Sequence, residues 1–570
     1  MGPGSSRAPR HVHIQVHVHV QVSAPGARRV VVHTETTSTD LHAEGIEGRW
    51  AGAFDAFDGE PYWLTVDDGP PLIDPSCWDL TITPIGPLSI VRSPWPVQPK
   101  GAPLVDPPVV YELHVKGFGG GYLGCIERLD HVVSVGANVI ELMPVHPFDD
   151  RHNYWGYMPL VWGAVHRNHA SSPERAAQEL AELISAAHQR GLHVWIDVVY
   201  NHTGEDEPML RGTGLRGYDP SVYRRTADGR WTNDSGCGND IDAGHPWVRD
   251  LVIEGLDRYA DLGVDGFRFD LASLLTRDRG GLVTRITEWA QQRGVTCIAE
   301  PWDMGGYQLG HGWPWPTWLQ WNDRFRDQVR GFLRGEPGLV RAVRQRVQGS
   351  PDLFGPDGAL RTLNFLTAHD GLTMYDLTTV TTDRHHSWDC GPELRLQQMK
   401  NYFTLLLLSA GTPMWVMGDE FGRTQDGHDN PYDVDGPLTR VDWAATATWR
   451  VLTEHVRRLG DLRRRNPLVL HRFYGVGPTL DEGFESRSIA WSVGDLYVMA
   501  NAWWEPLTFD VQEAGSWTVA VSSATPGPSI DGGRSVVVPP RSVVVLERPF
   551  RPGVEGLGEP PNERGGQVHR

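Results

Sequence analysis

Short apolar runs, each ending in polar residues, recur along the middle of the chain and predict the strands of a parallel sheet. Seven such runs occupy residues 109–115, 138–145, 193–202, 263–270, 296–301, 363–370 and 412–420. Amphipathic stretches lie between several of them, as in residues 172–191, where Ser172 is the expected N-cap. Strands that alternate with helices over roughly 330 residues predict a (β/α)8 TIM barrel, with a sixth strand near residues 318–325.

The segments that flank this region have strand-like patterns without helices. Residues 11–22 alternate His or Gln with Val or Ile, which is the period of a half-buried strand. One face of that strand carries His11, His13, His17 and His19, which indicates an exposed polar face or, as the alternative, a metal site. Short strand-like runs before residue 95 and after residue 464 predict an N-terminal β-sandwich and a C-terminal all-β sandwich domain.

These patterns divide the chain into six parts. We expect a flexible or edge-strand N-terminus at 1–22, a β-sandwich at 23–95, a proline-rich linker at 96–108, the barrel at 109–455, the second sandwich at 456–550 and a disordered tail at 551–570.

Composition excludes several classes of binding partner and indicates the cellular compartment. A chain of 570 residues is too long for one ordinary core, and its formal net charge of −19 argues against nucleic-acid binding through phosphate neutralisation. The five cysteines have no C-x-x-C spacing, which argues against structural zinc and favours a reducing compartment. No run approaches 18 consecutive apolar residues, and the N-terminus lacks the apolar stretch of a secretory signal. We therefore expect a cytoplasmic protein without a membrane partner.

Polar residues follow several of the predicted strands at their C-terminal ends, where the catalytic groups of parallel barrels gather. They are Asp197 with Asn201 and His202, Arg268 with Asp270, Glu300, and His369 with Asp370. A structural role explains any one of these positions, but folding alone does not require acids at the ends of four strands. The set indicates an active site.

The spacing of Arg268 and Asp270 places both side chains on one face of a strand, with Phe267 and Phe269 on the other. A structural ion pair is one interpretation, since a buried pair costs free energy unless its geometry is good. A glycosidic site is the other, because that chemistry needs one carboxylate and one carboxylic acid. Arg268 favours ionised Asp270 as the nucleophile, and the apolar stretch before Glu300 favours the acid role for Glu300.

Aromatic residues favour a sugar ligand. Residues 152–163, "HNYWGYMPLVWG", place Tyr154, Trp155, Tyr157 and Trp162 after the second strand, and residues 300–321 add further tryptophans that include Trp302. Aromatic faces stack on pyranose rings, although such residues also form loop cores. Because glycine and proline interrupt both stretches, we expect a binding rim.

Four short motifs in order resemble those of glycoside hydrolase family 13, the α-amylase family: "DVVYNH" (197–202), "GFRFD" (266–270), Glu300 and "AHD" (368–370). The resemblance implies Asp270 as nucleophile, Glu300 as acid/base and Asp370 as transition-state stabiliser. It also implies Tyr157 as the ring that stacks on the sugar at the cleavage point. Retention of anomeric configuration, another family property, requires a close carboxyl pair.

Finer motifs, among them "NYWGY", "IAEPWD", "WNDRFRD" and "GTPMWVMGDEFGRTQ", resemble the isoamylase and bacterial glycogen-debranching group. This implies hydrolysis of α-1,6 branch points in glycogen or amylopectin-type glucans, with 23–95 as a carbohydrate-binding-like sandwich. The alternatives are an α-1,4-acting relative (an α-amylase, a maltooligosyltrehalose trehalohydrolase or a transglycosylase) and a non-catalytic glucan-binding regulatory subunit. Residues 161–172 and 378–391 depart from the group's pattern, so no branch-length preference is carried over.

The resulting prediction is a retaining glycosidase that uses no cofactor and no metal. Asn201 matches a calcium ligand of true amylases, but debranching relatives often lack that ion and we do not predict it. The predicted catalytic residues are Asp270, Glu300 and Asp370. The predicted substrate-binding residues are Tyr157, Asp197, His202, Arg268, Trp302 and His369.

Overall fold

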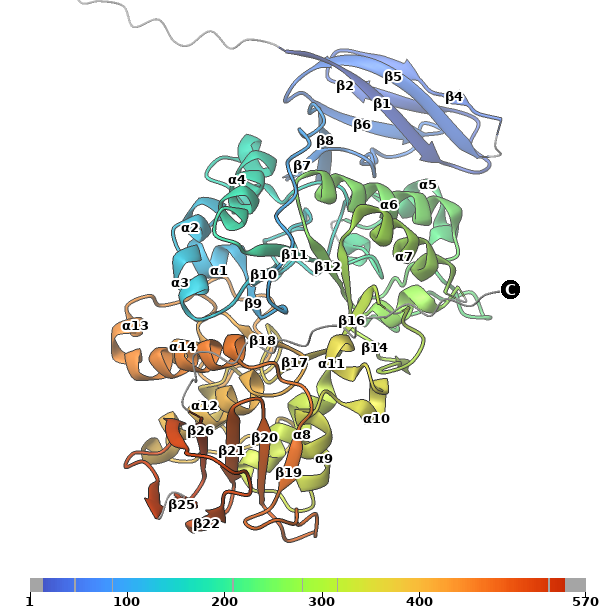
Figure 1. The fold of residues 1–570 in the computed structure, drawn as a ribbon. Coiled ribbons are helices and arrows are strands. Elements are labelled where there is room, and N and C mark those ends of the chain that lie inside the picture. The colour runs from blue at the N-terminus through green and yellow to red at the C-terminus, as the bar shows by residue number, and fades with distance from the viewer. Residues whose placement is uncertain are drawn as a thin grey trace, which may run out of the picture.

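The computed structural model describes residues 14–45, 48–84, 86–207, 210–278, 280–314, 316–531 and 534–548. Within them, eight parallel strands close into a barrel at the centre of the molecule (Figure 1). In chain order they are β9 (Val110–Leu113), β10 (Val139–Leu142), β11 (His193–Val198), β12 (Gly266–Phe269), β13 (Thr296–Ala299), β16 (Trp318–Asn322), β17 (Thr362–Phe365) and β18 (Thr412–Val416). The predicted TIM barrel is confirmed, including its sixth strand, which is β16.

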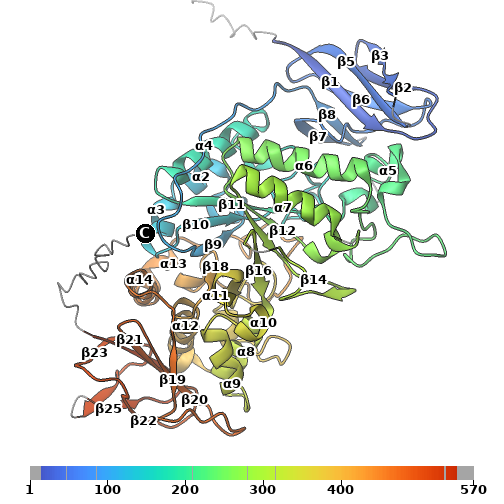
Figure 2. The same ribbon diagram turned by 45° about the vertical axis from the view of Figure 1, so that its right-hand side comes forward.

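Helices connect the strands and cover the outside of the barrel (Figure 2). They are α1 (Val115–Gly119), α2 (Tyr122–Ile126), α3 (Leu129–Ser134), α4 (Ala176–His188), α5 (Leu215–Tyr218), α6 (Pro246–Asp261), α7 (Gly281–Arg293), α8 (Asp323–Arg334), α9 (Val340–Val347), α10 (Pro351–Phe354), α11 (Gly358–Arg361), α12 (Pro392–Leu407), α13 (Ala445–Thr448) and α14 (Arg450–Arg465). The helix expected over residues 172–191 is α4. It begins after a 3-10 turn at Pro173–Arg175, which the side chain of Ser172 does not cap.

The period-two alternation of the strands separates two apolar cores. Phe267 and Phe269 pack in the core between barrel and helices, whereas Trp195 and Ile298 belong to a smaller cluster inside the barrel. Arg268 lies between the two phenylalanines and therefore faces the interior, as predicted. Polar residues on this inner face begin one layer above the apolar cluster, toward the C-terminal mouth.

An antiparallel β-sandwich stands on one side of the barrel (Figures 1 and 2). One sheet contains β1 (Gln15–Ser23), β4 (His42–Ala43) and β5 (Arg49–Phe57). The other contains β2 (Val30–Thr34), β3 (Ser38–Asp40), β6 (Pro61–Val66), β7 (Asp79–Thr83) and β8 (Gly86–Ile90). β1 is an edge strand in which Val16, Val20 and Val22 are buried and Val18 is half-buried, while His17 and His19 are exposed. His11 and His13 lie outside the described residues.

A second all-β domain stands on the opposite side, below α12 and beside α8 in Figure 1. Its larger sheet contains β19 (Arg472–Tyr474), β20 (Ser488–Val493), β21 (Leu496–Asn501), β23 (Thr518–Ser522) and β26 (Ser542–Glu547). Its smaller sheet contains β22 (Leu507–Asp510), β24 (Ser529–Asp531) and β25 (Ser535–Val538). Helix α14 crosses the boundary expected between residues 455 and 456, because one continuous apolar face packs against α12. The expected tail, residues 551–570, lies outside the described residues.

The barrel interior leaves no room for a side chain at Gly266, which pairs with Trp195 on the neighbouring strand. A Cβ atom there would lie 2.6 Å from Cδ1 of Trp195, whose indole is fully buried. We expect Gly266→Ala to lower the free energy of unfolding by about 1–3 kcal/mol through overpacking. Thermal unfolding measures this, with Gly436→Ala as the control, since a Cβ at Gly436 would meet nothing within 4 Å. Equal melting temperatures for the two variants would contradict the packing argument.

Candidate active site

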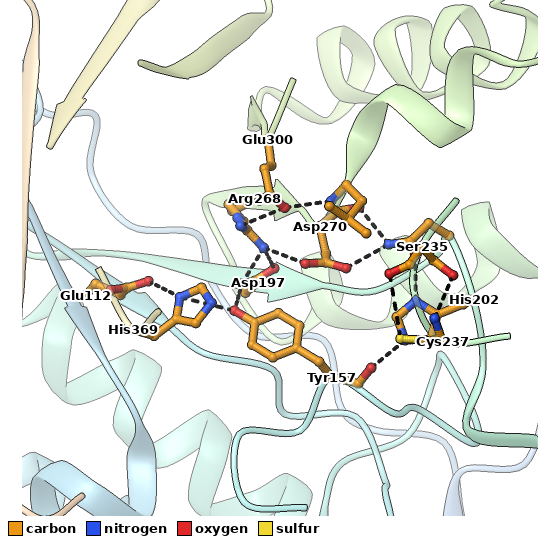
Figure 3. Close-up of polar contacts among 12 residues, drawn as sticks. Glu112, Tyr157, Asp197, His202, Ser235, Cys237, Arg268, Asp270, Glu300 and His369 are labelled. Carbon is orange, nitrogen blue, oxygen red and sulfur yellow. Dashed lines mark hydrogen bonds and ion pairs between the residues drawn. The ribbon is translucent and has the colours of Figure 1, made fainter. Parts of the chain in front are cut away.

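A buried arginine lies at the centre of the C-terminal mouth of the barrel. The side chain of Arg268 is 1% exposed, and its guanidinium contacts three carboxyl groups (Figure 3). The distances are 2.9 Å from Nη1 to Asp197 Oδ2, 3.1 Å from Nη1 to Asp270 Oδ1 and 2.9 Å from Nη2 to Glu300 Oε2. A buried charge of this kind is tolerated only when it is well paired. The three partners come from β11 and from the ends of β12 and β13. Arg268 thus connects the C-terminal ends of three neighbouring strands.

The two carboxyl groups expected to perform the chemistry are held in place by further donors. Nδ2 of Asn201 donates to Oδ2 of Asp270 at 2.8 Å and to the backbone oxygen of Asp270 at 2.7 Å. The backbone N–H of Leu271 donates to Oε2 of Glu300 at 2.8 Å. Leu271 has a φ of 39°, a left-handed conformation that is uncommon for a bulky residue. The chain thus takes a strained turn directly after Asp270.

Burial sets the protonation of the acidic groups. It raises the pKa of Glu300 to about 8; Arg268 opposes this rise and the charge of Asp270 adds to it. Burial likewise raises the pKa of Asp197 to about 7 against the opposing effect of Arg268. Glu300 therefore keeps its proton at neutral pH, which a general acid requires.

An aromatic and imidazole wall stands beside the arginine. The hydroxyl of Tyr157 donates to Asp197, and the ring of Tyr157 stacks on His369 with centroids 4.9 Å apart. Nδ1 of His369 lies 2.7 Å from Oε1 of Glu112, a buried residue of β9. Burial alone lowers the pKa of His369, but the charge and hydrogen bond of Glu112 raise it to about 9. His369 is therefore a cation at neutral pH.

His202 is held as a cation by its two ring contacts. Nδ1 lies 2.6 Å from Oδ1 of Asn201 and Nε2 lies 2.6 Å from the backbone oxygen of Tyr157. Both partners are acceptors, since the amide nitrogen of Asn201 already donates to Asp270. Both ring nitrogens must then carry protons. In agreement, Cys237 and Asp270 overcome the effect of burial and raise the pKa of His202 to about 9.

These groups line a cavity of about 880 Å³. Of the predicted site residues, those that line it are Tyr157, His202, Arg268, Asp270, Glu300, His369 and Asp370. Asp370 is the exposed member of the set. Crowding by protein atoms acts to raise the pKa of Asp370, but the charges of His369, Arg326, Arg268 and Arg330 outweigh this and lower it. The cavity thus has an ionised carboxylate, Asp370, at its rim and a protonated carboxylic acid, Glu300, deeper inside.

Two predicted site residues do not face the cavity. Asp197 lies beneath it, 1% exposed and bonded to Tyr157 and Arg268. Trp302 is half-buried in the short strand β14 (Trp302–Asp303) and packs on the apolar interior of the barrel. A substrate contact by Trp302 remains a prediction without support from this placement.

The expected aromatic rim is only partly correct. Trp155 and Tyr157 line the cavity, but Tyr154 and Trp162 are 4% exposed and belong to apolar cores. Three tryptophans of the second stretch are also buried: Trp313, Trp318 and Trp321. Trp321 faces the barrel interior, where the guanidinium of Arg268 lies 4.4 Å from its ring centroid. The glycines and prolines around these residues mark turns, but they do not specify which way an indole points.

Sequence reasoning missed several residues of the site. Glu112 and Cys237 were not identified, nor was Tyr432, which lines the cavity and whose backbone oxygen accepts the N–H of Tyr154 at 2.6 Å. For Glu112 a signal existed, since an acid inside the apolar run 109–115 is unusual for a buried strand. Within the described chain, no group of three or more His, Cys, Asp or Glu side chains is placed to hold a metal ion, and no helix is both long and apolar enough to cross a membrane.

Comparison with known proteins identifies relatives and a shared fold. The family described as "Alpha amylase, catalytic domain" matches residues 94–215. The glycogen operon protein GlgX homolog of Mycobacterium tuberculosis is 34% identical over 488 residues, covering 75% of this chain and 67% of that protein. Isoamylase 1, chloroplastic, of Arabidopsis thaliana is 36% identical over 418 residues, covering 59% of this chain and 53% of the relative. The chain thus spans between about half and two thirds of these relatives.

A solved structure extends the likeness to nearly the whole chain. Pullulanase from Paenibacillus barengoltzii, in complex with maltohexaose and α-cyclodextrin, superposes with a TM-score of 0.78 at 22% identity, covering 95% of each chain. At this identity the likeness concerns the fold.

The ion pair between Glu112 and His369 yields a test of the site's electrostatics. In Glu112→Gln the carboxylate charge is gone while burial remains, so the pKa of His369 should fall from about 9 to below its ordinary value of 6.5. Titration of labelled histidine by NMR measures this, with the signal assigned by its loss in His369→Gln. The exposed change Glu127→Gln serves as the control. An unchanged midpoint in Glu112→Gln would rule out Glu112 as the cause.

Proposed function

The chain belongs to the α-amylase family of glycoside hydrolases, among proteins named GlgX and isoamylase, and from this premise we propose that it hydrolyses α-1,6 branch points of glycogen- or amylopectin-type glucans. The observation that carries the proposal is the pair formed by Asp270 and Glu300. One guanidinium bridges both carboxyl groups, which holds them on the same side of the cavity. Retaining glycosidases need two such groups close together.

The proposed reaction has two steps. A carboxylate oxygen of Asp270 attacks the anomeric carbon while Glu300 gives its proton to the leaving glycosidic oxygen, which departs as the hydroxyl of the main chain. Glu300 then removes a proton from water, and that water displaces Asp270 from the anomeric carbon. The product is a released linear chain with the anomeric configuration retained. Two carboxyl groups and water suffice, so the mechanism calls for no cofactor.

The neighbouring residues take supporting roles in this proposal. Asp370, ionised at the rim, is suited to stabilising the positive charge that develops on the sugar ring. The cationic ring of His369 is engaged through Nδ1 and donates through Nε2 to a sugar hydroxyl. Both ring nitrogens of His202 are engaged by Asn201 and Tyr157, so His202 contributes its positive charge to the sugar site. Tyr157 presents its ring to the sugar at the cleavage point. Arg268, which lines the cavity, and Asp197, which lies beneath it, position the pair.

Cysteine usage supports a cytoplasmic location for this reaction. All five cysteines are free, and three of them, Cys77, Cys125 and Cys297, are buried. Free buried thiols are typical of proteins from reducing compartments. The proposed partner is accordingly an intracellular branched α-glucan.

One assay tests the proposed activity. The protein is incubated with amylopectin, and iodine staining is followed together with reducing ends. Debranching should make the stain bluer while reducing ends increase, because longer linear stretches become free to bind iodine. Bleaching would indicate α-1,4 cleavage, and no change would indicate a binding subunit; either result contradicts the proposal. In the same assay Asp270→Asn should lose activity by more than about 10³-fold, with glucan binding retained.

The alkaline limb of the pH profile tests the role of Glu300. Its pKa is raised to about 8, so above that pH the acid loses the proton that the leaving oxygen needs. We expect kcat/KM for a branched glucan to fall about tenfold per pH unit above that value.

A substrate whose leaving group needs no proton provides the control. Hydrolysis of α-maltotriosyl fluoride should not show the same alkaline loss. A parallel decline for both substrates would mean that a group other than Glu300 titrates.

A further inference from the structure

A second large cavity lies away from the catalytic mouth, between the N-terminal sandwich and helix α4. Its volume is about 910 Å³. One wall is formed by Trp78 and by Trp95 of the connecting segment, which runs past α4 toward the barrel in Figure 1. The other wall is formed by Gln178, Ser185 and Gln189 along α4. We call this cavity, with these five residues as its walls, the linker groove.

The aromatic wall of the linker groove is rigidly supported from below. The guanidinium of Arg258 lies 3.8 Å from the ring centroid of Trp78. Arg258 is buried and donates to the backbone oxygens of Ser76 and Cys77, at 2.7 and 3.0 Å, and also pairs with Glu254. The indole of Trp78 therefore has a fixed orientation that costs little to maintain on binding.

Trp95 completes an aromatic corner. Its ring meets that of Trp78 edge to face, with centroids 5.2 Å apart and planes at 76°. Both indoles are half-buried, so part of each ring remains open to the groove. Among the described residues, neither indole N–H has a hydrogen-bond partner. The corner thus offers apolar faces together with two available donors.

The facing wall is polar and also carries the charged side chains of Glu174, Arg175 and Glu182. Gln178, Ser185 and Gln189 are exposed and follow one another along one face of α4. Ala177 and Ala181 line the groove beside them, and the amides of Gln178 and Gln189 donate to Glu182 and Ser185 at 2.9 and 3.4 Å. Amides and hydroxyls opposite aromatic rings are the groups that recognise a sugar chain, because pyranose rings have apolar faces and hydroxylated edges.

Neighbouring cavities link the linker groove to the catalytic one. Asp149 lines the catalytic cavity and also a smaller one of about 400 Å³. Pro173 lines that smaller cavity and the linker groove as well. Three cavities that share lining residues in this way lie between the paired carboxyl groups and the aromatic corner, with Asp149 buried between the first two.

We propose that the linker groove binds an outer chain of the substrate, a run of α-1,4-linked glucose residues that extends away from the branch point in the catalytic cavity. This inference rests on the proposed debranching function and adds a second site to it. The groove raises affinity for large glucans, because a chain bound at both sites dissociates more slowly. Short branched oligosaccharides cannot reach it and gain nothing from it.

Two variants remove the groove in different ways. Trp95→Ala deletes one ring of the corner, and Ser185→Arg places a bulky side chain in the groove while keeping a residue that favours the helix. Gln292→Arg adds the same exposed guanidinium on α7, outside the groove, and serves as the matched control. Ser185→Arg keeps the test valid should Trp95→Ala fail to fold.

Affinity for glycogen is measured by retardation in native gels that contain glycogen, on an Asp270→Asn background. We expect both groove variants to bind about 3- to 10-fold more weakly, Trp95→Ala because it loses one aromatic contact and Ser185→Arg because its side chain obstructs the groove, with Gln292→Arg unchanged. With active enzyme, KM for glycogen should rise by a similar factor, while kcat/KM for a short branched oligosaccharide stays the same.

The outcomes separate this inference from the proposed function. Unchanged glycogen affinity in both groove variants would overturn the second site, even if debranching is observed. Equal losses on glycogen and on the short oligosaccharide would also overturn it, since the substitutions would then act through the fold. Weaker glycogen binding in a protein that does not debranch would support the groove and contradict only the proposed activity.

Discussion

The buried charge of Arg268 is the constraint on which the catalytic mouth depends. Removing a guanidinium from water costs several kcal/mol, and the cost is offset only by partners in good geometry. Here those partners are three carboxyl groups that belong to β11 and to the ends of β12 and β13. The register pairs Asp197 with Arg268 across neighbouring strands, so the closed barrel itself brings the charges together. The positions of the site residues are therefore set by the order and register of the barrel strands, and not by any one loop.

The same cavity holds carboxyl groups in opposite states because their surroundings differ. Glu300 is buried, so its protonated form is favoured even beside an arginine. Asp370 is exposed at the rim among several cations, which favour its ionised form. His369 shows the converse, since Glu112, assisted by the charge of Asp370, keeps the pKa of this imidazole raised to about 9 against the effect of burial. When the surroundings separate the pKa values of two groups in this way, one site can supply both an acid and a base at a single pH.

The eight strands and most of the site were predictable from local pattern. An apolar run indicates a strand, and the acid that follows it indicates the C-terminal end of that strand, where the mouth of the barrel lies. β16 shows how far this goes, since its run of buried residues was short yet correctly placed. Local pattern does not indicate which distant residue each side chain contacts in the folded protein. Glu112 and His369 are 257 positions apart, and only the closure of the barrel between β18 and β9 brings them together. The tryptophans of 300–321 were misjudged for the same reason, because burial depends on what packs over them.

Arg258 has a consequence for how this architecture can be divided. It belongs to a barrel helix, yet it donates to Ser76 and Cys77 and supports Trp78, all in the N-terminal sandwich. Ser76 in turn bonds Glu254, and Arg49 pairs with Asp250, both on that same helix. A barrel expressed without the sandwich would expose this cation and its apolar surroundings. The sandwich and the barrel therefore share a set of polar contacts that neither satisfies alone, and we expect them to be inherited together.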